Sequence, residues 1–377
     1  MHVLEILNAY PGETFIQEHA KAVIQYTDIK LSWAFWQTSR TGALPKPITG
    51  LKNCVGLINP NRISKVKKAG IRLAHLNDKD SYVKALKRQV KALKPDVIHF
   101  HFATLAVQHY RWVEELGIPF TFSIRGSDIR TETTRSDATI ETLKMVVHKA
   151  SRIHTVCDHL QDELFEIAGK NNKTTTIRTA IASHWRNVER KPELGNMVSI
   201  GRLHWSKGYA DLLLACDEMK KKEVSFKLTI IGEGEQRPLL EYMIRDLNLA
   251  DVVELVGKQD VTSIKSYLSW ADIFVLSSIA EGFPNVVAEA ALAGIPIVAS
   301  SGSFVSEVLS SESEFLIVPT GSPGEMANRL SELLDMDIGK KNAMANRARE
   351  QTLVELAPDR HATLFEKFWS KKCTVNR

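Results

Sequence analysis

Short apolar runs alternate with amphipathic segments along most of the chain. In the first half the runs predict strands at His2–Leu7, Leu31–Trp36, Asn53–Leu57, Ile71–Ala74, Val97–His101, Phe120–Ile124 and Ile153–Val156. In the second half they predict strands at Val198–Ile200, Leu228–Ile231, Val253–Val256, Ile273–Leu276, Ile297–Ala299 and Phe315–Val318. Strands that alternate with helical patterns indicate βαβ units and parallel sheets, so the expected fold class is α/β.

The helical patterns follow from the spacing of apolar side chains. The clearest helix, 81–94, places on one face Val83, Leu86, Val90 and Leu93. Another helix is expected from about Asn285 to Ala293, where Gly294 supplies a left-handed stop. A last helix is expected from Ala357 to Trp369.

A polar, aperiodic segment from His184 to Asn196 separates the two halves and is read as a linker. We therefore expect an N-terminal α/β domain at 1–185 and a C-terminal α/β domain at 196–356, followed by a helical segment at 357–377. The two domains would face each other across a cleft, because ligands of such sheets bind beyond the carboxyl ends of the strands.

Composition narrows the class of protein. With 44% hydrophobic and 25% charged residues among 377, the chain is expected to fold rather than stay disordered. It contains no apolar run long enough to span a bilayer, and its start does not resemble a secretory signal. The four cysteines are far apart, which suggests a reducing compartment. The expected location is cytoplasmic, possibly peripheral on the inner face of the plasma membrane.

The positive charge is concentrated in the first half. Residues 1–185 hold 26 Lys and Arg against 17 Asp and Glu, and most of the excess lies between Lys52 and Lys94. The basic face of the helix Lys84–Lys94 would suit an anionic membrane surface, although a solvated helix face is the alternative. Nucleic acid is not expected as a partner, because no aromatic residues are interleaved with these cations.

The segment EGFPNVVAEAALAGIPIVA, 281–299, carries the strongest chemical signal. It joins two predicted strands, and Pro284 suits the first turn of its helix. The helix N-terminus would suit a phosphate or a sugar oxygen, and Gly282 would let the backbone approach a ligand closely. Glu281 and Glu289 could accept hydrogen bonds from hydroxyls at two places on one ligand. Alternatively, they are a helix-terminus acid and a solvated acid.

Three further strand ends carry candidate ligand contacts. In SIGRLHWSKG, 199–208, Arg202 and Lys207 could clamp a diphosphate, or they could simply be surface cations. In LTIIGEGE, 228–235, the Gly232-x-Gly234 pair suggests a tight turn near a nucleotide, but an ordinary strand-to-helix turn fits as well. Gly257 and Lys258 end another strand and could pass close to a base, with the same alternative.

Taken in order, GRLHWSKG, IIGEGE, VELVG and EGFPNVVAEAALAGIPIVAS resemble glycosyltransferase family four. In the first half, YPGETFIQEH, PDVIHFHF and FSIRGSDI resemble family segments more loosely, the first of them in members that build bacterial surface polysaccharides. The resemblance implies the GT-B fold, a retaining mechanism and a nucleotide-diphosphate sugar as donor. It also implies a hydroxyl of a glycan or lipid-linked acceptor, in capsule, exopolysaccharide or lipopolysaccharide synthesis. In the GT-B fold 1–185 would be an acceptor-binding Rossmann-like domain, 196–356 a nucleotide-sugar-binding Rossmann-like domain, and 357–377 a C-terminal helix that packs back on the N-terminal domain.

The resemblance also implies roles at matched positions. Arg202 and Lys207 would hold the donor diphosphate, and Glu281 would bind hydroxyls of a hexosyl-type sugar. The backbone of Gly282, Phe283, Pro284 and Asn285 would lie near the sugar, and Glu289 would bind the ribose. Gly257 and Lys258 would lie near the base, and Gly12 would let the first loop approach the diphosphate and the acceptor. Neither a cofactor nor a metal is implied.

Two departures from the family pattern change these expectations. Many members have His-Gly-x-x-Asp where this chain has Arg125-Gly126-Ser127-Asp128. The histidine of those members would contact the donor sugar, whereas the cation at Arg125 could contact phosphate instead. The usual Asn-Gly-Val-Asp is replaced by Thr179-Ala180-Ile181-Ala182. Two rival functions remain open: a nucleotide-sugar epimerase or hydrolase of the same fold, and a non-catalytic nucleotide-sugar-binding module.

His99 and His101 lie two residues apart and share one face of their strand. A metal site needs more ligands than two, and the sequence offers no third partner. A core or cleft-lining role is therefore expected for both histidines.

Overall fold

A computed structural model describes residues 1–7, 14–36, 48–57, 79–132, 135–309 and 316–370. The chain forms two compact units, each described separately. The first comprises Met1–Ala180 with Pro358–Arg377, and the second comprises Ile181–Ala357. None of the helices within the described ranges is long and apolar enough to cross a membrane.

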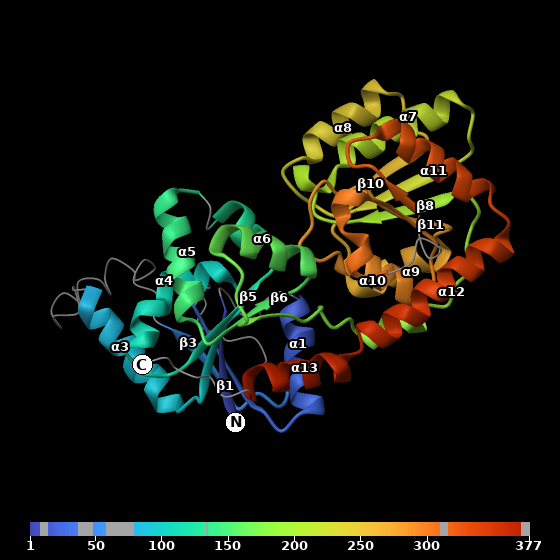
Figure 1. Cartoon of the computed structure of the whole chain (residues 1–377). Coiled ribbons are helices and arrows are strands. Elements are labelled where there is room, and N and C mark those ends of the chain that lie inside the picture. Colours follow the sequence, from blue (N-terminus) through green and yellow to red (C-terminus); the bar gives the residue numbers. More distant parts are fainter. Residues whose placement is uncertain (8–13, 37–47, 58–78, 133–134, 310–315, 371–377) are drawn as a thin grey trace, which may run out of the picture. The chain divides into compact units, whose positions relative to one another are not determined.

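The first unit is built on a parallel sheet with the strand order β3-β2-β1-β4-β5-β6-β7 (Figure 1). Its strands are β1 His2–Leu7, β2 Lys30–Trp36, β3 Asn53–Leu57, β4 Val97–Phe100, β5 Phe120–Ile124, β6 Arg152–Thr155 and β7 Thr174–Thr176. Six of the seven strands predicted for this half are confirmed within a residue or so, and the seventh, Ile71–Ala74, lies outside the described residues. Strand β7 was not predicted, because a short run of threonines gives no apolar signal.

Helices connect these strands, as expected for parallel pairing. They are α1 Thr14–Tyr26, α3 Lys79–Leu93, α4 Ala103–Glu114, α5 Asp137–Lys149 and α6 Asp158–Ala168. A further helix of this unit, α13 Pro358–Ser370, connects no strands and follows the second unit in sequence. The predicted helix 81–94 is confirmed as α3, and Leu86 and Val90 on its apolar face are buried. The helix ends where Lys94 takes a positive φ of 49°.

The second unit repeats the design with the strand order β10-β9-β8-β11-β12-β13. Its strands are β8 Asn196–Ile200, β9 Lys227–Ile231, β10 Val253–Gly257, β11 Ile273–Leu276, β12 Ile297–Ser300 and β13 Leu316–Val318. All six predicted strands of this half are confirmed. Its helices are α7 Tyr209–Lys221, α8 Arg237–Asp246, α9 Val261–Trp270, α10 Asn285–Leu292, α11 Pro323–Asp335 and α12 Ile338–Glu355.

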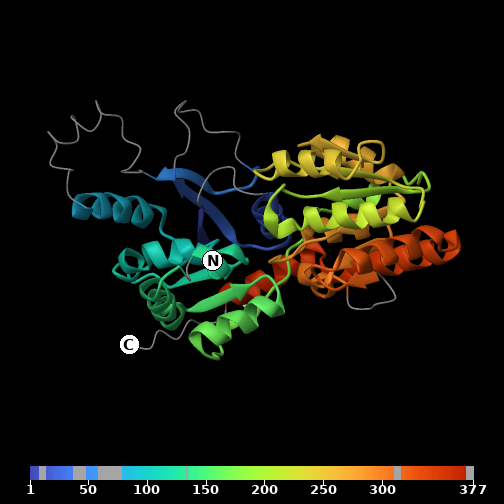
Figure 2. The ribbon, with the colours of Figure 1, turned by 90° about the horizontal axis from the view of Figure 1, so that it is seen from above.

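In both sheets the strand order reverses at one point. In the first unit the order reverses between β1 and β4, and in the second between β8 and β11. In both views the strands of each unit form a layer between helices (Figure 1, Figure 2). In doubly wound sheets of this kind, ligands bind at the carboxyl ends of the strands beside the reversal.

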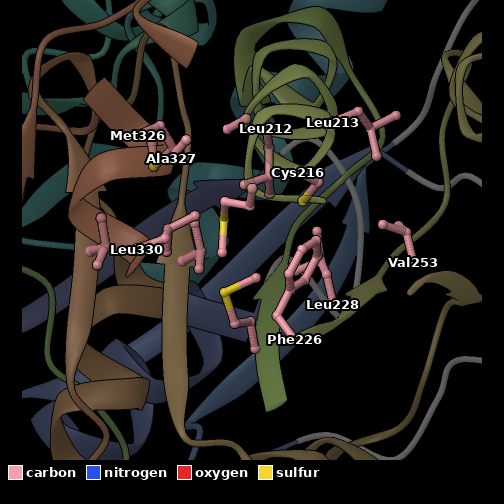
Figure 3. Close-up of a cluster of buried hydrophobic side chains, with 14 of the residues drawn as sticks. Leu212, Leu213, Cys216, Phe226, Leu228, Val253, Met326, Ala327 and Leu330 are labelled. Atoms are coloured by element: carbon pink, nitrogen blue, oxygen red, sulfur yellow. The ribbon is translucent and has the colours of Figure 1, made fainter. Parts of the chain in front are cut away.

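The core of the second unit between α7, α11 and the sheet is apolar. Side chains of α7, including Leu212, Leu213 and Cys216, meet Met326 and Leu330 of α11 over the sheet (Figure 3). Burying each such leucine contributes about 1.5–3 kcal/mol. This core fixes the positions of the strand ends, and through them the positions of the loops that follow.

The core of the first unit contains both ends of the described chain. Helix α13 packs against α1 (Figure 1). Its Phe365, Phe368 and Trp369 are almost fully buried over β1 and β2. The last predicted helix, 357–369, is therefore confirmed as α13, and the fold of the first unit needs residues that follow the second unit in sequence.

A layer of polar side chains lies beneath α1 and α13 on this sheet. The parallel register places Glu5 of β1 beside Trp33 of β2 and beside His99 of β4. The neighbouring positions complete the layer with His101, Thr121, Ser123 and His154, all almost fully buried. Two more histidines join from the helices, His19 of α1 and His361 of α13.

The hydrogen bonds of this layer define where most of its protons lie. His361 Nδ1 lies 2.8 Å from the carbonyl oxygen of Arg178, which can only accept, so Nδ1 carries the proton. Burial lowers the pKa of His361 to about 3, so its ring is neutral and its Nε2 accepts from His19 Nδ1 at 2.8 Å. The 2.7 Å contact between His19 Nε2 and Glu5 Oε1 must then contain a proton.

Glu5 is ionised within this layer. Burial alone would raise the pKa of its carboxyl group, but the rings of His101 and His19 hold that pKa well below its usual range. Trp33 Nε1 also donates to Glu5 Oε2 at 2.7 Å. A buried carboxylate needs such partners, because an uncompensated charge in the interior is costly.

Glycines allow the loops of the second unit to pack backbone against backbone. A Cβ at Gly232 would lie 1.8 Å from the carbonyl oxygen of Gly201, and one at Gly234 would lie 2.2 Å from that of Leu203. Gly208 has φ +61° and touches the carbonyl group of Ser277. The Gly-x-Gly pair after β9 is required by its contact with the loop after β8, and its predicted place near a nucleotide stays a prediction.

The segment read as a linker lies against the second unit. Residues 183–187 form a short 3-10 helix, Ser183–Asn187, in which Trp185 is buried. Farther along, Arg190 Nη1 donates to the carbonyl groups of Leu268 and Ala271 at the end of α9. The second unit therefore begins at Ile181, before this segment.

The buried histidines predict that acid destabilises the first unit. Burial lowers the pKa of His101 to about 4 and holds those of His99 and His154 well below their usual range. The unfolded chain therefore binds more protons below about pH 6.5, and each histidine removes up to about 1.4 kcal/mol of stability per pH unit. Thermal unfolding of the first unit should shift down by several degrees between pH 7 and pH 5.5.

Replacing one of these histidines supplies the control for this pH dependence. His154→Gln removes one proton-binding group from the layer, so the unfolding free energy should depend less steeply on pH, whatever the absolute stability of the variant. A melting temperature that does not change between pH 7 and pH 5.5 would contradict the proton assignment. The Glu5 carboxyl group of the unfolded chain titrates near its ordinary pKa of 4.5, which lies below this pH window.

Gly208→Ala should destabilise the second unit. A Cβ at this position would lie 2.1 Å from the carbonyl oxygen of Ser277, and left-handed backbone alone costs about 1–2 kcal/mol for a residue with a side chain. Gly321 has φ +71° and nothing within 4 Å of a built Cβ, so Gly321→Ala is the matched control. Urea unfolding should show the larger loss for Gly208→Ala; equal losses would disprove the steric explanation.

Candidate functional site

The candidate site of the second unit lies at the carboxyl ends of β8 and β11. Arg202 and Lys207 follow β8, and Glu281 follows β11. These strands are distant in sequence but are hydrogen-bonded neighbours, with Met197 beside Ile273 and Val198 beside Phe274. The two loops therefore meet where the strand order reverses.

Lys207 and Glu281 form an ion pair across these loops. Lys207 Nζ donates to Glu281 Oε1, and the two side chains are 19% and 12% exposed. Ser278 Oγ donates to the same carboxylate oxygen at 2.6 Å. The arrangement presents one cation and one carboxylate, both partly shielded from water. Because of this shielding, their electrostatic interactions with a ligand are stronger than they would be at an open surface.

Hydrogen bonds between the two loops hold both of them in place. Lys207 ends the 3-10 helix Trp205–Lys207, and its carbonyl group accepts a hydrogen bond from Ser277 Oγ at 2.8 Å. The backbone N–H of Ile279 donates to the carbonyl group of Ser206 at 2.7 Å. The loops after β8 and β11 are thus joined to each other through backbone as well as side chains.

Helix α10 begins at Asn285, four residues after Glu281. The predicted helix is confirmed, with Asn285 as its first residue and Gly294 at φ +74° just beyond its end. Phe283 and Pro284 are buried and shape the turn into the helix. Asn285 and Glu289 are four residues apart and therefore lie on one face of α10.

The other predicted contacts of this unit lie farther along the same edge of the sheet. Gly232 follows β9, and Gly257 ends β10 with φ +75°. Lys258 is exposed next to it. Arg202 is exposed as well, and the ion pairs of the described residues do not include it. The structure therefore brings Lys207 and Glu281 together but leaves Arg202 outside their contact.

Arg125 lies in the first unit, at the carboxyl end of β5. Its guanidinium stacks over the Phe15 ring, with Cζ 4.4 Å from the ring centroid, and Nε donates to the carbonyl group of His101 at 3.3 Å. The buried Asp128 accepts from the N–H groups of Arg125, Gly126 and Ala103, and burial raises its pKa. Gly12 lies outside the described residues.

One cluster of described residues has the donor set of a metal site. Ligand atoms of Glu5, His19 and His101 all lie within 4.8 Å of one another. His101 Nε2 lies 3.1 Å from Glu5 Oε1 but makes no hydrogen bond to it. Glu5 accepts instead from Trp33 Nε1, and its Oε1 lies 2.7 Å from His19 Nε2, so the three residues belong to the buried polar layer of the first unit.

Sequence reasoning missed Ser278, Glu5 and His19. Ser278 precedes Glu281 by three residues, a spacing that lets a hydroxyl reach the carboxylate, and this was the available signal. Glu5 stands in an apolar strand, where a charged residue indicates a partner. Its partners come from other strands and helices, so the pattern along the chain gave no indication of them.

Comparisons with known proteins agree with this geometry. The family model described as Glycosyl transferases group 1 matches residues 183–351, and that described as Glycosyltransferase Family 4 matches residues 60–183. Glycogen synthase of Mycobacterium tuberculosis is 27% identical over 294 residues, covering 75% of this chain and 68% of its own. The amylovoran biosynthesis glycosyltransferase AmsK of Erwinia amylovora is 34% identical over 182 residues, covering 46% of this chain and 45% of its own.

A solved structure extends the likeness over the whole chain. HepE of Anabaena, in a crystal structure with UDP and glucose, aligns with a TM-score of 0.77 at 15% identity and covers 98% of this chain and 99% of its own. This likeness establishes the fold, which is GT-B. With both family models matched along the chain and the family's motifs at the ends of β8 and β11, the chain belongs to glycosyltransferase family four.

Proposed function

We propose that this glycosyltransferase moves a hexosyl-type sugar, with retention, from a nucleotide-diphosphate donor to a hydroxyl of a glycan or lipid-linked acceptor. The observation that carries the proposal is the Lys207–Glu281 pair where β8 meets β11. A cation and a carboxylate side by side match a sugar diphosphate, whose leaving group is anionic and whose sugar offers hydroxyl donors.

The names of relatives support the kind of product. AmsK is an amylovoran biosynthesis glycosyltransferase, and LpsD of Rhizobium meliloti is a lipopolysaccharide core biosynthesis glycosyltransferase. We therefore place the reaction in the assembly of a bacterial surface polysaccharide. The matched segments span about half of these two relatives, so the acceptor rests on the proposal alone.

In the proposed mechanism, Lys207 takes up the charge that develops on the leaving diphosphate, and Arg202 adds a second cation from its exposed position. Such prepositioned charge is commonly the largest contribution to catalysis of this kind. Glu281 accepts from hydroxyls of the sugar, and the backbone of Gly282 to Asn285 lies beside it. Glu289 would bind the ribose, and Gly257 with Lys258 would lie near the base.

Retention follows from the resemblance to the family. The acceptor hydroxyl would attack from the face that the diphosphate leaves, and the leaving phosphate would accept its proton. Glu281 Oε1 accepts from Lys207 and Ser278, which suits a binding role better than that of a covalent nucleophile. Positioning of the two reactants then supplies much of the rate. The reaction is proposed to need no metal, because protein cations neutralise the diphosphate.

The first unit would bind the acceptor, close to an anionic membrane surface on its cytoplasmic side. Among the described side chains, three basic ones of α3 are exposed, Lys84, Arg88 and Lys91, as is Lys94 directly after the helix. Lys87 instead pairs with Glu115. Each exposed cation near a membrane of anionic lipid would contribute about 1 kcal/mol to binding.

Lys207→Ala and Glu281→Ala should each lower sugar transfer by two orders of magnitude or more while the fold persists. The first removes the charge opposite the diphosphate, and the second removes the acceptor of the sugar hydroxyls. Turnover with a nucleotide-sugar donor and an acceptor glycan is the measurement, and Lys227→Ala, an exposed cation at the amino end of β9, is the control. Wild-type turnover in Lys207→Ala would refute the clamp.

A panel of nucleotide sugars should raise the melting temperature of the wild type, because a ligand that binds only the folded state stabilises it. UDP-glucose, UDP-galactose, GDP-mannose and dTDP-glucose are the probes, each tested with and without EDTA. The shift should survive EDTA and shrink in Lys207→Ala. A shift that EDTA abolishes would contradict metal independence, and rapid donor conversion without acceptor would favour the epimerase or hydrolase alternative.

A further inference from the structure

Ser278 lies at the centre of the proposed donor site, and no role has yet been given to it. It follows β11, is fully buried, and donates its hydroxyl proton to Glu281 Oε1 at 2.6 Å. Lys207 donates to the same oxygen from the loop after β8. One carboxylate oxygen therefore holds both a cation and a buried hydroxyl.

The backbone of Ser278 is itself held in place. Its carbonyl group accepts from Ser300 Oγ at 2.5 Å, and Ser300 in turn accepts at its own carbonyl group from Ser303 Oγ at 2.5 Å. All three serines are almost fully buried. The series of hydroxyl bonds runs from the loop after β12 to the Glu281 carboxylate, so the hydroxyl group of Ser278 has little freedom to move away.

Lys207 and Ser278 differ in what a donor would do to them. A diphosphate competes with Glu281 for the Lys207 ammonium group, because it carries more negative charge than a carboxylate. The diphosphate does not compete for the hydroxyl group of Ser278 in the same way, because Ser278 is fully buried and donates to Glu281. When Lys207 turns to the diphosphate, the hydroxyl of Ser278 still donates to Oε1.

We propose that Ser278 is a positioning residue that keeps the Glu281 carboxylate in its sugar-binding orientation while Lys207 is engaged by the diphosphate. The inference rests on the proposed function. It assigns the two residues different roles: Lys207 binds the diphosphate, and Ser278 positions Glu281, which binds the sugar. A merely structural serine would instead stabilise the loop and affect every ligand alike.

This difference between the two roles has a measurable signature. Loss of the Ser278 hydroxyl should weaken binding of a nucleotide sugar but spare the nucleoside diphosphate, which lacks the sugar. A hydrogen bond to a charged group is worth enough to change affinity by about tenfold. Turnover should fall together with the donor affinity, because the misplaced carboxylate also serves the transition state.

The experiment measures the affinity of Ser278→Ala for UDP-glucose and for UDP by calorimetry, with GDP-mannose and GDP as the second pair. The expected result is a loss of about tenfold for the sugar donor that the wild type binds, with the matching diphosphate within about twofold. Equal losses for both ligands, or no loss for either, would overturn the inference.

Ser199→Ala is the matched control. Ser199 is also fully buried in this unit and donates to a carbonyl group, that of Val275, at 2.7 Å, but it does not touch Glu281. It should lower the melting temperature without separating the two ligands. If Ser278→Ala does not fold, Ser278→Cys keeps the buried shape with a weaker donor, and a smaller selective loss is expected.

The outcomes separate this inference from the proposed function. A wild type that binds nucleotide sugars more tightly than the matching diphosphates, with a Ser278→Ala variant that behaves like Ser199→Ala, would refute the role of Ser278 alone. A wild type that binds none of the four ligands would refute the proposed donor and, with it, the inference.

Discussion

Parallel pairing of β8 with β11 is the constraint on which the candidate site depends. These strands are adjacent because the strand order reverses between them, and the reversal places two loops, far apart in sequence, at one edge of the sheet. Glycines at 208, 232 and 234 let the backbones approach more closely than any side chain would allow. Lys207 and Glu281 meet as a consequence, and the hydroxyl group of Ser278 donates to the same carboxylate oxygen.

The two units solve the same folding problem with different cores. The second unit buries an almost entirely apolar layer between α7, α11 and its sheet. The first unit buries a carboxylate and several imidazoles beneath α1 and α13, and two of these imidazoles, those of His361 and His154, hydrogen-bond to the carbonyl groups of Arg178 and Ile177. Such a layer makes stability depend on pH, and it also ties α13 to the sheet through His361 and His19.

Family membership and site geometry support each other from independent directions. The family models match stretches of sequence, whereas the HepE likeness rests on shape at an identity too low to carry function. The ion pair at β8 and β11 adds the chemical reason that such a fold suits a sugar diphosphate. The roles that the family pattern implies for Arg202 and Arg125 stay predictions: Arg202 is exposed in the loop after β8, and Arg125 stacks on Phe15 in the first unit.

The sequence by itself determined the α/β class, nearly every described strand, the helix that begins at Asn285 and its glycine stop, because apolar period and turn chemistry are local properties. It also singled out Lys207 and Glu281 through the family pattern. Only the tertiary structure decided that these two touch, that Ser278 shares their oxygen, and that Glu5 meets His19, His101 and Trp33. Those contacts depend on strand order and register, which join residues that no local pattern relates.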